Sequence, residues 1–321
     1  MSGDQDEGVK LVADIGATNA RFAVILDRCS VPTHENVLPC AAYPSIVGAI
    51  EDYLSKLAAP RPNCAALAIA NPVTGDWVQM TNHVWAFSIE ETRKSLGFDR
   101  LVVLNDFSAL AMALPLLLRE ELRQVGGGEA VSGAPLALIG AGTGLGVSGL
   151  IPTRAGWVPL QGEGGHTSLC PADEREADIL RIVWREYKHV STERLVSGIG
   201  LGNLYRAVAE LNGRARDALS PAEITEGALK ENNPLCIEVL NTFCGMLGTA
   251  AANLTLTLGA RGGLYIGGGI VPRLGAYFDQ SPFRRRFEDK GRFSDYLAAI
   301  PTYVITAATP AFLGAAQALR G

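Results

Sequence analysis

The chain has 321 residues, 48% of them hydrophobic and 19% charged, so it can bury a substantial core and does not resemble a disordered chain. This length allows two domains of ordinary size or one large one. The net charge of −5 argues against binding nucleic acid through the overall field of the protein. Anions can still bind where a loop supplies backbone N–H groups.

The cysteines and the N-terminal residues indicate a cytoplasmic protein. The six cysteines, at positions 29, 40, 64, 170, 236 and 244, contain no C-x-x-C pair, so we expect reduced thiols and no structural zinc site. The segment from Met1 to Gly8 is polar and acidic, unlike a secretory signal. The longest uninterrupted apolar runs have about ten residues, which is too short to span a bilayer. We therefore expect no membrane association.

Strands and helices alternate along the first third of the chain. Short β-rich or apolar runs predict four strands, at Lys10–Ile15, Phe22–Leu26, Cys64–Ala70 and Leu101–Leu104. The first two enclose a loop, which predicts a strand–turn–strand unit. A helix is expected at Phe107–Leu118, directly after the fourth strand.

The same strand–turn–strand pattern returns later, at Leu136–Ile139 and Val147–Ile151, and suggests a weak internal repeat of two related lobes. Another strand is expected at Gly262–Ile266. The remaining periodic segments predict helices at Asp173–His189, Gly200–Leu211, Asn233–Leu256 and Thr309–Arg320. The interleaving of strands and helices places the chain in the α/β class.

The loop after the first strand, Asp14-Ile-Gly-Ala-Thr-Asn-Ala-Arg21, has the residues of a phosphate-binding turn. Gly16 allows a sharp turn, and the amides around Thr18 and Asn19 can donate to phosphate oxygens. Asp14 could hold a water of a hydrated Mg²⁺, and Arg21 could meet phosphate charge. An ordinary hairpin with a polar tip explains the pattern equally well. The segment lacks the Walker form G-x-x-x-x-G-K-[ST].

A second loop, Gly140-Ala-Gly-Thr-Gly-Leu-Gly146, has four glycines in seven residues, which is costly in backbone entropy unless a special backbone path is needed. A strand on each side suits a phosphate cradle. The dinucleotide fingerprint needs a helix at this point. The residues after Gly146 are β-like instead, so an NAD-dependent oxidoreductase is disfavoured.

Polar residues at element ends supply further candidate groups. Asn105 and Asp106 lie at a strand end and a helix start, where helix amides stabilise a carboxylate and where Asp is also a common cap. In Gly162-Glu-Gly-Gly-His166, glycines leave a carboxylate and an imidazole exposed, and such a loop can direct acceptors and donors at sugar hydroxyls. A metal site is the alternative, disfavoured because no second histidine has the spacing for zinc, and a lone histidine is often simply hydrogen-bonded within the structure. Glu193 precedes a helix, where an exposed salt bridge is the default interpretation. Gly267-Gly268-Gly269 permits close approach of adenine or simply forms a tight turn.

Taken together, these segments resemble one family, the bacterial glucokinases of the hexokinase and actin-like ATPase superfamily. The resemblance keeps the family's order over nearly the whole chain. It covers Asp14–Arg21, Asn71–Trp85, Leu104–Pro115, Gly140–Gly149, Gly162–His166, Glu193–Ala207, Gly262–Arg273 and Phe287–Phe293. Ala17 departs from it, because many relatives have a second glycine there. The zinc-binding cysteine cluster of the related repressor–kinase group is missing, which favours the plain glucokinase branch.

The resemblance implies a role for each candidate. Asp106 is implied as the base that takes the proton from the 6-hydroxyl of the sugar. The implied sugar-binding residues are Asn105, Asp106, Glu163, His166 and Glu193. The implied nucleotide- and phosphate-binding residues are Asp14, Gly16, Ala17, Thr18, Asn19, Gly142, Thr143, Gly144, Gly267, Gly268 and Gly269.

The resemblance also implies a fold and a reaction. The fold is a two-lobed actin-like ATPase (ribonuclease H-like) fold with a cleft that closes on sugar. Its small α/β domain would comprise 1–112 and 307–321, and its large α/β domain 113–306. The reaction is phosphorylation of D-glucose to glucose 6-phosphate by ATP with Mg²⁺, the entry step of glycolysis, in a homodimer.

Several alternatives stay open. Fructose or mannose could replace glucose, and ADP or polyphosphate could replace ATP as the phosphoryl donor. A sugar sensor or transcriptional regulator on the same fold would need an added DNA-binding helix-turn-helix, for which the expected first strand at about residue 10 leaves no room at the N-terminus.

Overall fold

The computed structural model describes residues 8–26, 31–81, 83–215 and 218–320. The chain divides into two compact units. The first unit comprises the described residues of Met1–Leu118, Trp157–Gln161 and Ala307–Gly321, and the second those of Arg119–Gly156 and Gly162–Thr306. Three separate chain segments therefore form the first unit, and its last segment includes the C-terminal helix.

A five-stranded sheet with the order β3-β2-β1-β4-β7 forms the centre of the first unit. Its strands are β1 (Lys10–Ile15), β2 (Asn19–Ile25), β3 (Thr33–Pro39), β4 (Cys64–Ile69) and β7 (Arg100–Asn105). β1, β2 and β3 pair antiparallel, whereas β1, β4 and β7 run parallel. The carboxyl ends of three neighbouring strands therefore meet at one edge of the sheet. A separate ribbon pairs β5 (Trp77–Gln79) with β6 (Ala86–Ser88).

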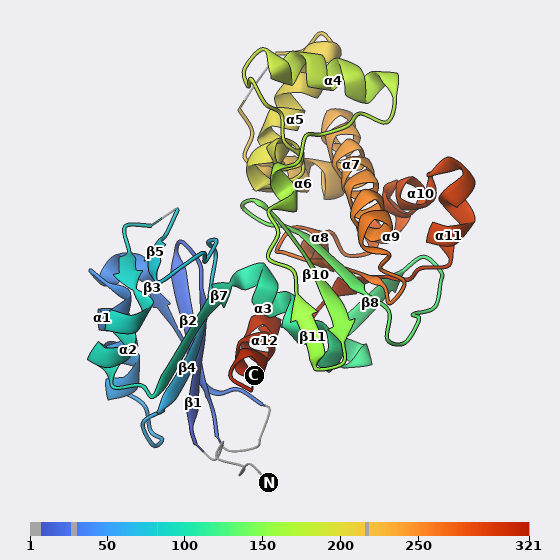
Figure 1. Cartoon of the computed structure of the whole chain (residues 1–321). Helices are drawn as coiled ribbons and strands as arrows, with labels where there is room; N and C mark the ends of the chain where they lie inside the picture. The colour runs from blue at the N-terminus through green and yellow to red at the C-terminus, as the bar shows by residue number, and fades with distance from the viewer. Residues whose placement is uncertain (1–7, 27–30, 82, 216–217, 321) are drawn as a thin grey trace. The chain divides into compact units, whose positions relative to one another are not determined.

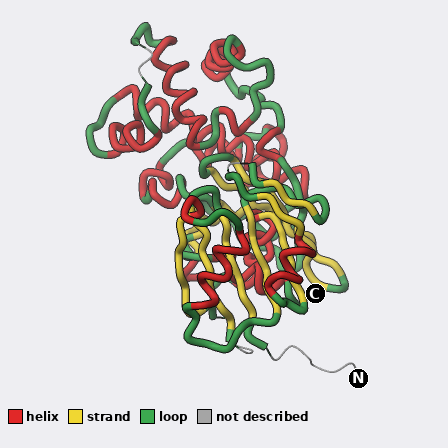
Figure 2. The backbone as a smooth tube through the Cα atoms, turned by 90° about the vertical axis from the view of Figure 1, so that its left-hand side faces the viewer, coloured by secondary structure: helices red, strands yellow, loops and turns green. Residues whose placement is uncertain are grey.

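Helices cover both faces of this sheet because its strands are apolar on both sides. Along β1, Leu11 and Ala13 pack on the face covered by α1 (Ile46–Ser55) and α2 (Ile89–Leu96). Val12, between them, packs instead with Phe312 of α12 (Pro310–Ala318). This alternation is the period of two that a strand imposes on its side chains. Figure 1 places α1 and α2 on the opposite side of the strands from α12, and Figure 2 looks onto the α1 and α2 face.

The contact of α3 (Asp106–Ala113) with α12 is unusually close. A Cβ atom placed on Gly314 of α12 would overlap the carbonyl oxygen of Ala109 in α3. Small residues let helix backbones approach in this way, and close-packed interiors give little room for an added methyl group. α3 begins at Asp106, so this contact also fixes the position of a candidate catalytic residue.

A second sheet has six strands in the order β11-β10-β9-β12-β13-β8. Five of them lie wholly in the second unit: β8 (Leu122–Val125), β9 (Leu136–Ala141), β10 (Leu145–Thr153), β12 (Leu264–Gly267) and β13 (Thr302–Ile305). Of the edge strand β11 (Gly156–Pro159), only Gly156 is assigned to the second unit. β9 pairs antiparallel with β10 and parallel with β12, which in turn runs parallel to β13. This repeats the arrangement of β1, β2, β4 and β7, so the internal repeat predicted from the sequence is confirmed at the level of topology.

The second unit also contains most of the helices. They are α4 (Glu174–Trp184), α5 (Gly198–Leu211), α6 (Pro221–Leu229), α7 (Pro234–Leu258), α8 (Val271–Leu274), α9 (Ala276–Gln280), α10 (Phe283–Glu288) and α11 (Ser294–Ala298). Short 3-10 turns lie at η1 (Cys40–Ala42) and η2 (Leu114–Leu116) in the first unit. In the second unit they lie at η3 (Arg119–Glu121), η4 (Gly164–His166), η5 (Thr192–Arg194) and η6 (Gly291–Phe293).

α7 is the core helix of the second unit. The side chain of Asn233 caps it, accepting from the N–H groups of Leu235 at 3.0 Å and Cys236 at 3.4 Å, and Pro234 occupies the first turn as predicted. Within the described residues it is also the single helix long and apolar enough to cross a membrane, with a mean hydropathy of 1.4. The search of the sequence for membrane spans considered only uninterrupted apolar runs and therefore did not find this helix, whose apolar residues are interrupted by polar ones. Because 72% of its apolar window is buried, it has the character of a packed core helix; the absence of membrane association stays a prediction.

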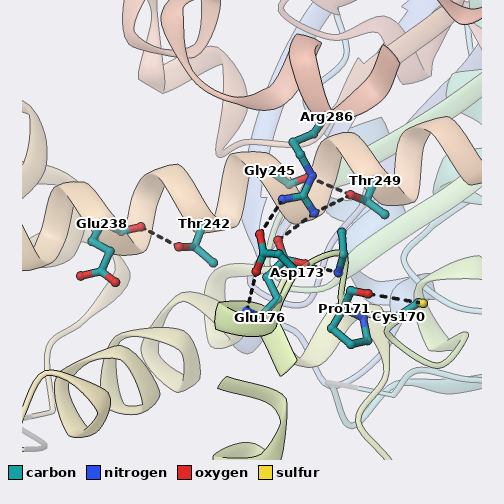
Figure 3. A network of polar contacts seen from close by, with 10 residues as sticks. Cys170, Pro171, Asp173, Glu176, Glu238, Thr242, Gly245, Thr249 and Arg286 are labelled. Carbon is teal, nitrogen blue, oxygen red and sulfur yellow. Dashed lines mark hydrogen bonds and ion pairs between the residues drawn. The ribbon is translucent and has the colours of Figure 1, made fainter. Parts of the chain in front are cut away.

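The guanidinium group of Arg286 links the three helices α4, α7 and α10 (Figure 3). Arg286 of α10 pairs with Glu176 of α4 at 2.8 Å and with Asp173, which caps α4, at 3.4 Å. It also donates to the hydroxyl of Thr249 in α7 at 3.0 Å. Glu176 is 3% exposed, and a carboxylate this deeply buried requires such a partner. The network fixes the start of α4 and the segment that leads into it from η4.

The predicted elements differ from the observed ones mainly at their ends. The helix predicted at Phe107–Leu118 is α3 followed by η2, because Pro115 prevents the helix from continuing. The helix predicted at Asp173–His189 ends at Trp184. Several observed elements were not predicted: the strands β3, β5, β6, β8, β11 and β13 and the helices α1, α2, α6, α8, α9, α10 and α11. Most of these strands are short or polar, so they form no long apolar run. The five described cysteines carry free thiols, and Cys29 lies outside the described residues.

The close α3–α12 contact predicts that Gly314→Ala destabilises the protein. The added methyl group must push α12 away from α3, and overpacking of this kind costs about 1–3 kcal/mol. We expect a lower urea midpoint for unfolding of the full chain, together with reduced turnover because α3 carries Asp106.

Gly48→Ala in α1 is the matched control. Its Cβ would lie 3.6 Å from the hydroxyl of Ser45, which is ordinary contact, and alanine favours helix by about 1 kcal/mol over glycine. The control should leave the midpoint unchanged or raise it. Equal midpoints for the two variants would contradict the tight α3–α12 contact.

Candidate functional site

The candidate residues of the first unit lie at the carboxyl ends of its parallel strands. Asp14 is the last residue but one of β1, Asn71 lies two residues after the end of β4, and Asn105 is the last residue of β7. The parallel register pairs Ile15 with Ile69 and Ile69 with Asn105, so these ends are level with one another. In open α/β sheets, ligands bind outside this edge.

The β1–β2 turn is a compact hairpin with an exposed tip. The N–H of Gly16 donates to the carbonyl of Asn19 at 3.0 Å, and the carbonyl of Thr18 accepts from Cys40 N–H at 2.9 Å. Neither Gly16 nor Ala17 has a positive φ, and a Cβ on Gly16 would lie 3.5 Å from the nearest atom. Alanine at position 17 therefore suits the backbone. The sharp turn expected after the first strand is present between Ile15 and Asn19, and it is formed without a positive φ at Gly16.

Asp14 and Arg21 face each other across this hairpin. Arg21 Nη1 donates to Asp14 Oδ2 at 3.1 Å, in a pair whose arginine side chain is 45% exposed. Burial raises the pKa of the Asp14 carboxyl above its ordinary value, and the Arg21 charge opposes this effect only in part. A carboxyl group whose pKa is shifted by burial and by a specific charged neighbour is typical of a functional position.

Asn105 and Asp106 have distinct places at the start of α3. Asn105 is the cap, its Oδ1 accepting from the N–H groups of Phe107 at 2.9 Å and Ser108 at 3.1 Å. Asp106 is the first helical residue, and its Oδ1 accepts from Asn105 Nδ2 at 3.0 Å and from Phe107 N–H at 2.9 Å. Asp106 is thus not the helix cap, and the capping interpretation left open for it does not apply.

Asn71 is a site residue for which no role was predicted. It is 9% exposed, its Oδ1 accepts from the N–H of Thr81 at 2.9 Å and from the Thr81 hydroxyl, and its carbonyl accepts from Asn105 Nδ2 at 3.4 Å. The segment 71–81 therefore holds the amide that orients Asp106. The sequence signal was an asparagine directly after a buried strand, which is also a common turn residue.

In the second unit, the strand ends bring the two glycine segments together. β9 and β12 run parallel with Gly140 opposite Gly267, so the Gly142–Gly144 loop and the Gly267–Gly269 turn lie at the same sheet edge. Gly268 has φ +77°, and a Cβ there would overlap the backbone of Ala141. Only glycine fits this position. In the Gly142–Gly144 loop, by contrast, no residue has a positive φ, and the glycine at position 144 is needed for space, because a Cβ there would overlap the carboxylate of Glu193.

Glu163, the residue before η4, and His166, the last residue of η4, are both exposed, as the glycine-rich segment predicted. A Cβ on Gly164 would lie 2.7 Å from Val147, and one on Gly165 would overlap the carbonyl of Leu145. The glycines thus let η4 pack directly on β10, and this packing directs the two polar side chains outward. His166 also lines a cavity of about 370 Å³ together with Glu193.

Glu193 lies in η5 and is half-buried. Its Oε2 accepts from the N–H of Leu145 at 2.8 Å, directly after the Gly142–Gly144 loop. The default interpretation as an exposed salt bridge was wrong, because the carboxylate binds a backbone amide of another segment.

Within the described part of the chain there is no group of three or more His, Cys, Asp or Glu side chains able to hold a metal ion. Magnesium bound with a nucleotide needs no such cage, since it takes one or two carboxylates, water and phosphate oxygens. Asp14 fits this requirement: it is a partly exposed carboxylate beside the backbone turn of β1 and β2.

Comparison with solved structures defines the class of the fold. A glucokinase from an Antarctic psychrotroph superposes with a TM-score of 0.89, at 38% identity, over 97% of this chain and 98% of that one. A glucokinase from Balamuthia mandrillaris, solved with glucose, gives a TM-score of 0.79 at 20% identity, over 98% of this chain and 94% of that one. The chain has the two-domain α/β fold of the sugar kinases.

The sequence comparison is more specific. The glucokinase family model matches residues 11–321. The glucokinases of Neisseria gonorrhoeae and Chromobacterium violaceum are each 54% identical to this chain over 97% of its length, covering 94% and 89% of those proteins. The chain belongs to the glucokinase family.

The raised pKa of Asp14 predicts that Asp14→Asn does not destabilise the free protein. A folded-state pKa above the unfolded value means that Asp14 favours folding at acidic pH and loses this effect as the pH rises through the folded pKa. Removing the charge at pH 7 should therefore raise the melting temperature by about 1–3 °C, while turnover falls about 10–100-fold.

Asp76→Asn is the control of opposite sign. The hydroxyl of Ser88 and the N–H of Glu90 lower the pKa of Asp76, so its carboxylate favours folding at neutral pH. Its loss should lower the melting temperature. A melting temperature for Asp14→Asn several degrees below that of the unmodified protein would show that Asp14 serves the fold instead.

Proposed function

We propose that this protein transfers the γ-phosphoryl group of ATP to the 6-hydroxyl of D-glucose, with Asp106 as the general base. The proposal rests on one observation above all: in a chain of the glucokinase family, an aspartate stands at the first position of α3 with one carboxylate oxygen fixed by two hydrogen bonds. The product, glucose 6-phosphate, enters glycolysis.

The surroundings of Asp106 suit proton acceptance. The N-terminus of α3 stabilises negative charge on the carboxylate. Asn105 Nδ2 and Phe107 N–H both donate to Oδ1 of Asp106. These hydrogen bonds fix the orientation of the carboxylate, so that the sugar hydroxyl approaches it from one direction. A base placed in this way aligns the hydroxyl for in-line attack and accepts its proton as the bond to phosphorus forms.

Phosphoryl transfer needs positioning and charge stabilisation more than covalent chemistry. We assign the phosphate groups to the β1–β2 turn, from Gly16 through Ala17 and Thr18 to Asn19, and to the Gly142-Thr143-Gly144 loop. The N–H groups of Gly16 and Gly142 donate within their own turns, to the carbonyls of Asn19 at 3.0 Å and Gly144 at 2.8 Å, so the other N–H groups of these two segments would donate to phosphate oxygens. Gly267-Gly268-Gly269 would lie against adenosine. The space beside Gly268 is filled by the backbone of Ala141, whereas a Cβ on Gly269 would meet only the Arg273 side chain, at 4.0 Å, so the open backbone of this turn is at Gly269.

Magnesium is part of the proposal. Asp14 would hold the ion through a water molecule, and the ion would neutralise charge on the β- and γ-phosphate oxygens. Arg21 balances the charge of Asp14 when no cation is bound.

We assign the remaining candidates to the sugar. Exposed Glu163 and His166 and half-buried Glu193 would bind its hydroxyls, and a site of this kind rejects sugars that leave a buried polar group unpaired. Asn105 uses its amide oxygen to cap α3 and its amide nitrogen to hold Asp106. We therefore propose that it positions the base, and direct sugar contact by Asn105 stays a prediction.

The organisation of the molecule completes the proposal. We propose a small domain of 1–112 and 307–321, a large domain of 113–306, a homodimer and a cytoplasmic location. The internal repeat of the two sheets supports the domain division. Size-exclusion chromatography with light scattering would test the homodimer.

The first experiment is a coupled assay for glucose 6-phosphate with Mg²⁺ and ATP, run beside fructose, mannose and galactose. ADP and polyphosphate replace ATP in parallel reactions. Activity on glucose with ATP is the expected result. A preference for another hexose or another donor would replace that part of the proposal, and no turnover by folded protein would refute it.

For Asp106→Asn we expect an unchanged fold and glucose affinity, with kcat lowered about 10²–10⁴-fold, the usual contribution of a positioned base. Glucose binding is measured by calorimetry and turnover by the coupled assay. Asp99→Asn is the matched control, since Asp99 is exposed and precedes β7 at the end remote from Asp106. Near-normal turnover of Asp106→Asn would refute the assignment of the base.

A further inference from the structure

The carboxylate of Glu193 contacts the phosphate loop of the second unit. Its Oε2 accepts from Leu145 N–H at 2.8 Å. The neighbouring Gly144 leaves space for it, because a Cβ at position 144 would overlap this same oxygen. A hydrogen bond from a backbone amide to an ionised oxygen is stronger than one between neutral groups. The end of the loop is therefore held by a side chain that belongs to a segment 48 residues further along the chain.

The same segment also holds the start of the loop. Gly198, the first residue of α5, donates its N–H to the carbonyl of Gly142 at 2.8 Å. Ser197 stiffens the connection, donating to the carbonyl of Glu193 at 2.7 Å and accepting from Gly200 N–H at 3.0 Å. Residues 193–198 thus clamp the Gly142–Leu145 loop at both ends.

The clamp is joined to the segment that carries His166. Thr192 N–H donates to the carbonyl of Thr167 at 2.8 Å, and Ser168 and Ser191 form an isolated antiparallel bridge. Glu193 and His166 line one cavity. A ligand in this cavity can therefore reach the carboxylate that holds the loop.

We propose that Glu193 is a positioning residue for the nucleotide: it sets the conformation of the Gly142–Leu145 loop and so couples sugar binding to phosphate binding within the second unit. The inference rests on the proposed function of this site. Oε2 holds the loop, and Oε1 is the oxygen that accepts from a sugar hydroxyl. Sugar bound to Oε1 restricts the carboxylate to the rotamer that holds Leu145, which lowers the ordering cost of the loop when phosphate binds.

Coupling of this kind is reciprocal. If glucose raises the affinity for nucleotide by some factor, nucleotide must raise the affinity for glucose by the same factor. Couplings between sites are typically about 5–150-fold. If Glu193 only bound sugar, replacing it would not change nucleotide binding in the absence of sugar. If it also positions the loop, replacing it weakens nucleotide binding even without sugar.

The first test compares Glu193→Ala with Glu163→Ala, using Mg²⁺-ADP as the probe in calorimetry. Without sugar, we expect Glu193→Ala to weaken ADP binding about tenfold and Glu163→Ala to leave it unchanged. With saturating glucose, the gain in ADP affinity should be lost in Glu193→Ala. Both variants should raise KM for glucose, since both residues are assigned to the sugar.

Glu193→Gln is the second variant, in case truncation at this half-buried position disturbs folding. The amide oxygen of glutamine can still accept from Leu145 at the same reach, so the loop contact is retained without its charge. We expect ADP affinity between that of the unmodified protein and that of the alanine variant. Equal ADP affinity for the unmodified protein and both Glu193 variants would overturn the inference.

The second test changes the loop and measures the affinity for glucose. Gly144→Ala keeps every carboxylate but forces its methyl group against Glu193, whereas a Cβ on Gly142 meets no atom within 4 Å. We expect Gly144→Ala to raise the glucose Kd, measured without nucleotide, by about fivefold or more, and Gly142→Ala to leave that Kd unchanged. Equal glucose Kd values for the two variants would overturn the coupling.

These tests are independent of the proposed reaction. If the unmodified protein phosphorylates glucose but Glu193→Ala binds ADP normally, the inference fails and the proposed function stands. If the protein phosphorylates no hexose, the proposed function fails, and the effect of Glu193 on ADP binding still reports on the loop contact.

Discussion

The parallel pairing of the central strands is the constraint on which the candidate site depends. In the first unit, β1, β4 and β7 end level with one another and place Asp14, Asn71 and Asn105 at one sheet edge. In the second unit, β9 and β12 do the same for the two glycine segments. A shift of register by one residue would turn every side chain to the opposite face, and both faces of the sheet in the first unit are packed against helices, so the packing of the sheet also fixes the site.

Glycine acts here mainly by allowing close approach. Gly314 lets α12 contact α3, Gly144 admits the carboxylate of Glu193, and Gly165 lets η4 lie on β10. Each of these contacts fixes a candidate residue in place. Gly268 is different, since it combines close contact with a positive φ. The chain uses space beside its backbone, more than unusual backbone angles, to bring polar groups together.

The sequence allowed much of this to be predicted, within physical limits. Apolar strands such as β1 and β9 and the capped helix α7 were predicted because their patterns are local. The contact of Glu193 with Leu145 was not, because no sequence pattern relates groups so far apart in the chain. The buried place of Asn71 was missed for the same reason. The reason for the glycines of the Gly142–Gly144 loop could not be predicted either, because glycine content does not distinguish a need for space, as at Gly144, from a need for positive φ.

The position of the transferred phosphoryl group tests the central claim most directly. The product formed from glucose and Mg²⁺-ATP can be examined by ¹H–³¹P correlation NMR, which reports the carbon whose oxygen carries the phosphate. The account predicts coupling of phosphorus to the two protons on C6, and loss of this signal when Asp106 is replaced by asparagine. Phosphate at another hydroxyl, or free phosphate as the main product, would contradict it.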